Sequence, residues 1–266
     1  MYRSPVPTKA ETPFVSIVVP VLNEAALIGP FLRHLESLRP AVEIIVVDGG
    51  STDQTLTMAG PLADRVFSAP RGRAAQMNAG AEIATGAVLW FLHADLRVPA
   101  KAIEKIQAAL EDDRVAGGCF RLRYPRREWI YRVSDLLGNL GVNVFGFALG
   151  DHGIFCRRPA FVGAGGYPLV PILEDAELYR RLRAIGRMKQ LREKIVSDPR
   201  TFEKRGRYRT TAVYFLILAL YVAGVPITCL DRIYRRFHRR LQVGALAGSS
   251  DDFSRDPAKR AGEFQL

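Results

Sequence analysis

The sequence predicts an α/β protein built on a mostly parallel sheet, with helices on both faces of the sheet and a helical segment near the C-terminus. Two observations carry this prediction. Short runs in the first part of the chain are apolar throughout, as expected of strands that are buried on both faces of a parallel sheet. The stretches between these runs carry apolar residues at three- and four-residue spacing, which predicts covering helices.

The first two strands are the most clearly marked. Residues 15–20 (VSIVVP) and 43–48 (EIIVVD) are rich in Val and Ile, the β-branched residues that favour strands. Between them, apolar residues recur every three or four positions from Ile28 to Leu38, which predicts a helix. Ser51 or Thr52 can cap a further helix after the second strand.

Two more strands and two more helices follow. Residues 65–68 (RVFS) predict a short strand, residues 73–84 a helix, and residues 88–92 (VLWFL) a fourth strand. The chain then passes through Pro99, a residue that suits the start of a helix. Apolar residues at helical spacing mark this helix: Ile103, Ile106 and Leu110.

The pattern is less regular in the second half. Residues 115–124 predict a further strand, and residues 151–158 (DHGIFCRR) predict a strand that polar residues precede. The uncharged, glycine-rich segment at 136–150 is either a mobile loop or a loosely wound helix. Residues 174–186 predict a helix with acidic residues in its first turn and a glycine at its end, which suits the helix dipole.

Composition limits the partners without choosing among them. The 266 residues carry a formal net charge of +11, which favours anionic partners such as nucleic acid, phosphorylated ligands or an anionic membrane. Cys119, Cys156 and Cys229 are far apart and form no C-x-x-C pair, which argues against a zinc site built on paired cysteines. Such sparse cysteines fit the reducing cytoplasm.

Polar or charged side chains follow the end of each of the first four predicted strands. Because the carboxyl ends of parallel strands meet at one edge of a sheet, where ligands bind, we expect these side chains to lie together. A lone Asp after a strand is usually a turn residue. The combination predicts a site of mixed charge for a nucleotide phosphate, its base and a divalent cation. The side chains are Asn23, Glu24, Asp48, Arg71, Arg73, His93 and Asp95.

Five motifs, in order along residues 15–191, resemble those of the family 2 glycosyltransferases. These are inverting enzymes of the Rossmann-like GT-A fold that use nucleotide-diphosphate sugars. The motifs are SIVVPVLNE, IIVVDGGSTDQT, RGRAAQMNAGAEIATG, FLHAD and the acid pair Glu174–Asp175. The Q-x-x-R-W motif of processive synthases is absent from the sequence, which favours addition of one sugar to a small-molecule or lipid-linked acceptor.

The resemblance implies a role for each matching residue. Asp48 is implied to contact the nucleobase, and Arg71 to flank the base or a phosphate. Asp95 is implied to bind the divalent cation, magnesium or manganese, that bridges the diphosphate. Asp175, with Glu174 beside it, is implied to act as the general base. The residues implied to bind the nucleotide are Pro20, Asn23, Glu24, Asp48, Arg71, Arg73, Asn78 and His93.

Several alternatives stay open at this level. His93 stands where the family usually has Asp, so it either contacts nucleotide or metal or is a structural turn residue. Glu174 and Asp175 can instead cap their helix. The chain can also be an inactive nucleotide-sugar-binding or membrane-recruited module. A nucleotidyltransferase would need a glycine-rich, lysine-bearing phosphate loop after the first strand, where this sequence has PVLNEAALIG.

The C-terminal region contains an uncharged stretch at residues 212–230, with arginines on both flanks and interruptions at Gly224 and Pro226. Its length is at the lower edge of a membrane span, so a helix on the membrane surface, or one packed on the catalytic domain, is favoured over a span. We expect a leader (1–13), a catalytic domain (14–205), this helical segment (206–242) and a disordered tail (243–266).

These expectations place the protein in the cytoplasm, with peripheral contact to the inner face of the plasma membrane and no nucleic acid partner. A narrower resemblance concerns GDHGIFCRR and the segment from RTFEKRGRYRTT to DRIYRR. Both are similar to a bacterial subgroup that is encoded near radical enzymes and linked to arsenosugar biosynthesis. That resemblance implies a small soluble acceptor.

Overall fold

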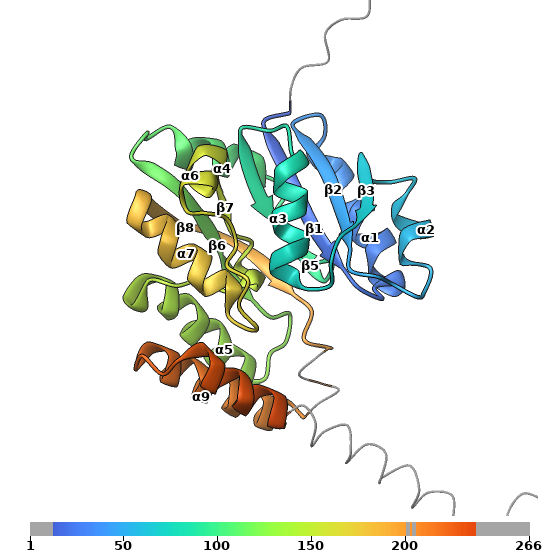
Figure 1. The fold of residues 1–266 in the computed structure, drawn as a ribbon. Coiled ribbons are helices and arrows are strands. Elements are labelled where there is room, and N and C mark those ends of the chain that lie inside the picture. Colours follow the sequence, from blue (N-terminus) through green and yellow to red (C-terminus); the bar gives the residue numbers. More distant parts are fainter. Residues whose placement is uncertain (1–12, 201–202, 204–205, 238–266) are drawn as a thin grey trace, which may run out of the picture. The chain divides into compact units, whose positions relative to one another are not determined.

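The computed structural model describes residues 13–200, 203 and 206–237 (Figure 1). They belong to two compact units, which divide between residues 201 and 202. Nearly all of the predicted leader and the whole predicted tail lie outside the described residues. The predicted end of the catalytic domain, at residue 205, also lies outside them.

The first unit is built around a mixed eight-stranded sheet with the order β3-β2-β1-β4-β7-β6-β8-β5. β1 pairs in parallel with β2 and β4, and β2 pairs in parallel with β3, as predicted. β7 runs antiparallel between β4 and β6, and the short β5 runs antiparallel to β8. The strands are β1 (Val15–Val21), β2 (Val42–Asp48), β3 (Arg65–Ser68), β4 (Val88–Phe91), β5 (Leu96–Arg97), β6 (Val115–Arg123), β7 (Phe155–Arg157) and β8 (Arg187–Ser197).

Helices cover both faces of this sheet, as predicted (Figure 1). Side chains alternate along β2, so that Ile44 and Val46 pack with α1, α2 and α4 on one face. Ile45 and Val47 pack with α3, α6 and α7 on the other face. The helices of this unit are α1 (Ala25–Leu35), α2 (Thr55–Ala59), α3 (Arg73–Ile83), α4 (Ala102–Leu110), α5 (Trp129–Leu140), α6 (Arg158–Gly163) and α7 (Glu174–Ile185).

Three local features differ from the sequence-based predictions or decide between two alternatives that the sequence left open. The predicted cap at Ser51 or Thr52 is wrong, because α2 begins only at Thr55 and the Ser51 hydroxyl donates to Asp48 instead. Of the two alternatives for residues 136–150, the helical one is present, as the end of α5 and a π-helical turn at Gly141–Phe145. β8 was not predicted, because its charged residues resemble a surface helix more than a strand.

A buried carboxylate, Glu43, ties the amino ends of β1 and β2 to the turn before β4. Its Oε1 accepts hydrogen bonds from the Ser16 hydroxyl, from the Thr85 amide and hydroxyl, and from the Gly86 amide. Burial alone would raise the pKa of Glu43, but these hydrogen bonds together lower it below its usual value. The folded protein is therefore stabilised by the ionised form of Glu43.

We expect Glu43→Gln to lower the free energy of unfolding by about 2 kcal/mol at pH 7, because the four donors lose a charged acceptor. Because the pKa of Glu43 is lower in the folded protein than in the unfolded chain, its ionised form stabilises the fold at neutral pH, and this stabilisation is lost as pH falls. The difference in unfolding free energy between the variant and wild type should therefore shrink below about pH 4. Urea unfolding at pH 7 and pH 3 measures the difference. The exposed Glu104→Gln is the matched control, and equal losses in both variants would contradict the assignment.

The second unit, in its described part, contains α9 (Arg207–Val222) and a second helical stretch at residues 227–237. Gly224, with a φ of 84°, makes the turn between them. The rings of Tyr214 and Tyr234 stack with their centroids 6.4 Å apart, so the two helices pack as a hairpin. The predicted C-terminal helical segment is thus confirmed. In the part of the chain that the structure describes, we find no helix with the length and apolar character that crossing a bilayer requires.

Candidate functional site

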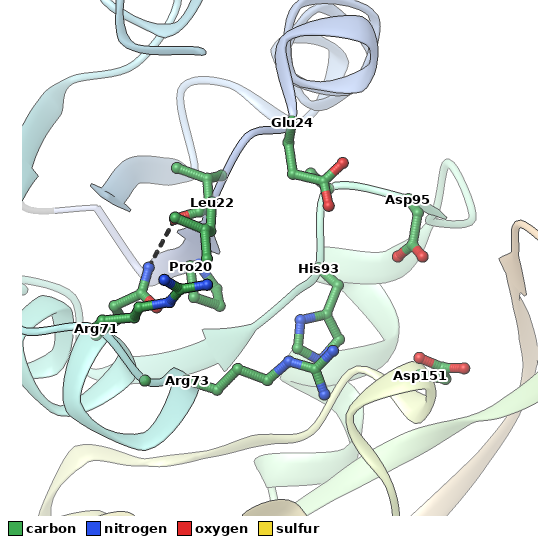
Figure 2. A pocket seen from close by; sticks show the side chains of 12 residues that line it. Pro20, Leu22, Glu24, Arg71, Arg73, His93, Asp95 and Asp151 are labelled. Carbon is green, nitrogen blue, oxygen red and sulfur yellow. Dashed lines mark hydrogen bonds between the residues drawn. The ribbon is translucent and has the colours of Figure 1, made fainter. Parts of the chain in front are cut away.

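A cavity of about 360 Å³ opens at the carboxyl edge of the sheet (Figure 2). The segments that follow β1, β3 and β4 form most of its wall, as the polar strand ends predicted. The 3₁₀ turn Gly150–His152 adds the remaining side. The lining residues are Pro20, Val21, Leu22, Glu24, Arg71, Gly72, Arg73, Gln76, His93, Ala94, Asp95 and Asp151.

Carboxylates gather on one side of this cavity. Figure 2 shows Glu24, Asp95 and Asp151 on this side, with Asp95 between the other two. Burial raises the pKa of Asp95 to about 7, and the negative charges of Asp151 and Glu24 contribute to this rise. The buried Oδ1 atom of Asp95 has no hydrogen-bond partner within the described chain. A buried carboxylate oxygen without a partner is unfavourable unless a cation or a donor binds it.

These residues fit a divalent cation that is shared with a ligand. Among residues 13–200, 203 and 206–237, no three His, Cys, Asp or Glu side chains form a complete metal cluster. Magnesium, however, is usually held by one or two carboxylates together with substrate phosphates rather than by a cage of protein ligands. Asp95, with its unpartnered oxygen, and the neighbouring Asp151 match that arrangement.

Cationic groups face the carboxylates. In Figure 2 the Arg73 guanidinium extends toward His93 and Asp151, while Arg71 lies on the opposite side, beside Pro20. Burial lowers the pKa of His93 to about 4, and the positive charge of Arg73 contributes. His93 is therefore a neutral imidazole at pH 7 that can accept or donate a hydrogen bond. The cavity thus offers two guanidinium groups to an anion and carboxylates to a cation.

The acid pair lies at the start of α7, behind the cavity wall. Both Glu174 and Asp175 are buried. α7 begins at Glu174 with Leu173 at the cap position, so neither acid is the capping residue. The Tyr167 hydroxyl donates to Asp175 Oδ1 at 3.0 Å. Burial raises the pKa of Asp175 to about 7, and the charge of Glu174 adds to the effect.

Gly150 connects the acid pair with the cavity. A Cβ atom on Gly150 would lie 2.2 Å from His93 Nε2 and 2.8 Å from Asp175 Oδ2. His93 and Asp175 therefore contact the same short backbone segment, which Asp151 follows directly. Arg73 provides a second connection, since its Nη1 lies 3.9 Å from Glu174 Oε1.

Three of the predicted nucleotide residues do not line the cavity. Asp48 is buried, and its carboxylate accepts hydrogen bonds from the Gly50 and Ser51 amides. Asn23, with a φ of 55°, accepts a hydrogen bond at its Oδ1 from the Thr52 amide at 2.8 Å. In this structure both residues shape the loops after β1 and β2. Their contacts with a nucleotide stay predictions.

Asn78 is the third residue, and it supports Asp175 through Tyr167. Its side-chain amide donates to the Tyr167 carbonyl at 2.9 Å and accepts from the Tyr167 amide at 2.8 Å. Tyr167 in turn donates to Asp175. The sequence motif that contains Asn78 is therefore linked to the predicted base through one intervening residue.

Sequence reasoning missed several residues of the site. Gln76 lines the cavity and donates to the Val21 carbonyl at 2.9 Å and the Val47 carbonyl at 2.7 Å, which fixes α3 against the strand ends. Asp151 and Gly150 come from a segment whose only sequence signal is the GDHG run. Arg200, after β8, places its Nη2 atom 3.7 Å from Glu24 Oε2.

Residues 16–162 match the family model described as glycosyl transferase family 2. Two similar proteins are named undecaprenyl-phosphate 4-deoxy-4-formamido-L-arabinose transferase. The one from Pseudomonas savastanoi is 30% identical over 156 residues, covering 54% of this chain and 46% of the relative. The one from Pseudomonas paraeruginosa is 32% identical over 158 residues, with the same coverage of 54% and 46%. The chain thus spans about half the length of the curated relatives it matches.

Solved structures share the fold. A mannosyltransferase from Pyrobaculum calidifontis, in complex with GDP-mannose and Mn²⁺, superposes with a TM-score of 0.62 at 22% identity, covering 93% of this chain and 77% of that one. Glucosyl-3-phosphoglycerate synthase from Mycobacterium tuberculosis, with Mn²⁺, UDP-glucose and phosphoglyceric acid, superposes with a TM-score of 0.59 at 20% identity, covering 85% and 87%. The predicted GT-A fold is confirmed. The narrower resemblance to the arsenosugar-linked subgroup stays a prediction.

Proposed function

The chain belongs to glycosyl transferase family 2, and we propose that it moves a sugar from a nucleotide-diphosphate donor to an acceptor hydroxyl with inversion. The observation that carries the proposal is the cavity at the sheet edge. It presents arginines and carboxylates to one ligand, and a buried acid pair stands directly behind it. A nucleotide diphosphate with its sugar has the charge and polarity to fill such a cavity.

The donor diphosphate would lie between the guanidinium groups and the carboxylates. Arg71 and Arg73 suit phosphate oxygens, because a guanidinium donates charge-assisted hydrogen bonds in a fork that matches them. Asp95 and Asp151 are the residues that would hold magnesium or manganese. When bound there, the cation supplies positive charge that stabilises the leaving diphosphate.

Asp175 is the proposed general base. A carboxylate whose pKa lies near 7 can take a proton from an acceptor hydroxyl at neutral pH. The acceptor oxygen then forms its bond to the anomeric carbon while the bond to the diphosphate oxygen breaks, and the electron pair leaves with the diphosphate. This single displacement inverts the anomeric centre. Tyr167 and Asn78 orient the base.

A lipid-linked acceptor is the proposed second substrate. The curated relatives described above are named for transfer to undecaprenyl phosphate, a membrane lipid. The net charge of +11 would favour approach to an anionic membrane from the cytoplasmic side. A small soluble acceptor is the alternative that the arsenosugar-like resemblance implies.

A panel of nucleotide sugars tests the function. The purified full chain is incubated with UDP-, GDP- and dTDP-sugars and manganese, and release of the nucleoside diphosphate is followed without an acceptor, with a lipid-phosphate acceptor and with small soluble alcohols. Acceptor-dependent release from one donor supports the proposal. Tight donor binding without release or transfer would favour an inactive nucleotide-sugar-binding module instead.

We expect Gly150→Ala to lower turnover by about a hundredfold, because the new methyl group displaces His93 or Asp175 from its place. The assay is nucleotide release at saturating donor, with thermal unfolding to verify the fold. Gly138→Ala is the matched control, since a Cβ atom there meets its nearest neighbour, Leu122 Cδ2, at an ordinary 3.6 Å. Full activity of the Gly150 variant would contradict the close approach.

A further inference from the structure

α5 and the π-helical turn that follows it are apolar on the face that points away from the protein. The exposed fraction reaches 62% for Trp129 and 65% for Leu136. A surface helix ordinarily places polar residues on its solvent side and apolar residues on its core side. The exposed apolar face, which we call the α5 face, consists of Trp129, Leu136, Leu137, Leu140, Val144 and Phe145.

The exposed apolar side chains lie on one side of a regular helix. Trp129, Leu136 and Leu140 are seven and four residues apart, so they share a side of the helix. The opposite side, with Ile130, Tyr131 and Ser134, is buried. Contiguous exposed apolar side chains of this kind mark a surface that another apolar phase covers.

The surroundings of the α5 face are basic. Residues 121–147 contain five arginines and two acidic residues. Arg126, Arg127 and Arg132 are exposed, and Arg132 lies between Trp129 and Leu136 along the helix. One of the acids, Asp135, accepts a hydrogen bond from the Tyr124 amide at 2.8 Å. Apolar side chains bordered by arginines match the chemistry of an anionic lipid surface, with acyl chains below and phosphates above.

The α5 face is also connected to the cavity. The Tyr124 hydroxyl, next to α5, donates to Asp151 Oδ2 at 3.3 Å. The chain runs from α5 through the π-helical turn and reaches Gly150 ten residues after Leu140, with Asp151 directly behind it. Figure 1 shows α5 at the opposite end of the first unit from α1 and α2.

We propose that the α5 face docks the catalytic unit onto an anionic phospholipid bilayer, with Trp129, Leu136 and Leu140 inserted at the headgroup level. This inference deepens the proposed function: membrane docking serves catalysis only if the acceptor is linked to a lipid, as proposed above. Docking would bring the Asp151 side of the cavity to the membrane, where such an acceptor lies. The surrounding arginines make the binding salt-sensitive and selective for anionic lipid.

The two tryptophans of the chain allow a direct test. Trp90 is completely buried, so it gives a constant background, whereas Trp129 lies on the α5 face. The full chain is titrated with vesicles of phosphatidylglycerol and phosphatidylcholine, or of phosphatidylcholine alone. We expect a shift of the emission to shorter wavelength, and quenching by brominated acyl chains, only with the anionic vesicles. Both signals should vanish in Trp129→Phe.

Co-sedimentation with the same vesicles locates the binding surface. Leu136→Ser combined with Leu140→Ser should weaken vesicle binding about tenfold or more, because two leucine side chains are no longer transferred from water into the lipid. The matched control replaces two apolar residues of the same unit that are exposed elsewhere, Val162 (70%) and Leu169 (79%), by Ser. This control should bind like wild type. A third variant, Leu216→Ser with Val222→Ser, tests the second unit.

The outcomes are distinct. No vesicle binding by the intact chain, or binding lost only in the Leu216/Val222 variant, would overturn the proposal. So would concentration-dependent dimers that disappear in the Leu136/Leu140 variant, since the face would then bind a second copy. Nucleotide release from a soluble donor is measured in parallel. If the α5 face binds vesicles but no nucleotide is released, the proposed function is wrong and the docking stands. If nucleotide is released but the α5 face does not bind vesicles, only the docking is rejected.

Discussion

Asp175→Asn is expected to reduce sugar transfer about a hundredfold or more while donor binding stays close to wild type. The amide has nearly the same shape and can still accept the Tyr167 hydrogen bond, but it cannot take a proton from the acceptor. Because Asp175 is not among the residues that line the proposed donor cavity, the donor loses no direct contact. Turnover at saturating donor, together with calorimetric titration of the nucleoside diphosphate, measures both quantities.

The stability of this variant separates catalysis from a structural role. Burial raises the pKa of Asp175 to about 7, so the folded protein retains a proton that the unfolded chain releases near pH 4. The ionised group therefore costs stability, and this cost grows as pH rises toward 7 and is complete above it. We expect Asp175→Asn to unfold at a temperature about 3 °C higher than wild type at pH 8. A large drop in that temperature would indicate that Asp175 only supports the fold.

Glu174→Gln is the neighbouring control. Glu174 pairs with Arg73 at 3.9 Å, whereas the Tyr167 hydroxyl donates to Asp175. Its loss should change donor binding through Arg73 by less than about tenfold and leave transfer largely intact. A dead Glu174 variant with an active Asp175 variant would move the base by one residue.

Sequence predicts best those strands that are apolar throughout. β1, β2 and β4 are apolar on both sides because helices cover both faces, and no surface helix has such a pattern. The polar ends of β1 and β4, with the arginines after β3, therefore predicted the cavity edge. The predicted residues that line it are Pro20, Glu24, Arg71, Arg73, His93 and Asp95. β8 was missed because most of its residues are only half-buried and several are charged, so no clear alternation of apolar and polar residues marks it.

The missed site residues depend on contacts between distant segments. Asp151 enters the cavity because β7 inserts antiparallel between β4 and β6, and no local pattern predicts that pairing. Tyr167 reaches Asp175 while Asn78, on α3, holds its backbone. Asp48 ends β2, as predicted, and its carboxylate accepts hydrogen bonds from the Gly50 and Ser51 amides, while its contact with a nucleobase stays a prediction. Strand order and turn geometry arise only when the sheet assembles, so a local sequence pattern does not predict them.

Asp95→Asn is expected to abolish the metal-dependent part of nucleotide binding. In wild type, manganese or magnesium should tighten the binding of UDP or GDP by about a hundredfold, because the cation neutralises charge between the diphosphate and the carboxylates. The substituted amide would leave Asp151 as the remaining carboxylate of the proposed pair, and one carboxylate holds the cation weakly. Calorimetric titration of the nucleotide with and without the metal measures the difference. Glu104→Gln, an exposed acid on α4, is the control and should behave as wild type.

The same substitution should act in the opposite direction without metal. The Oδ1 atom of Asp95 is buried without a partner in the described chain, and burial raises the pKa of Asp95 together with the charges of Asp151 and Glu24. Removing that charge relieves repulsion, so metal-free Asp95→Asn should unfold at a higher temperature than metal-free wild type at pH 8. Added manganese should then stabilise wild type and leave the variant unchanged. If manganese tightened nucleotide binding equally in both proteins, Asp95 would not be a ligand, and the unpartnered oxygen would need a different explanation, such as a donor on the sugar or the ribose.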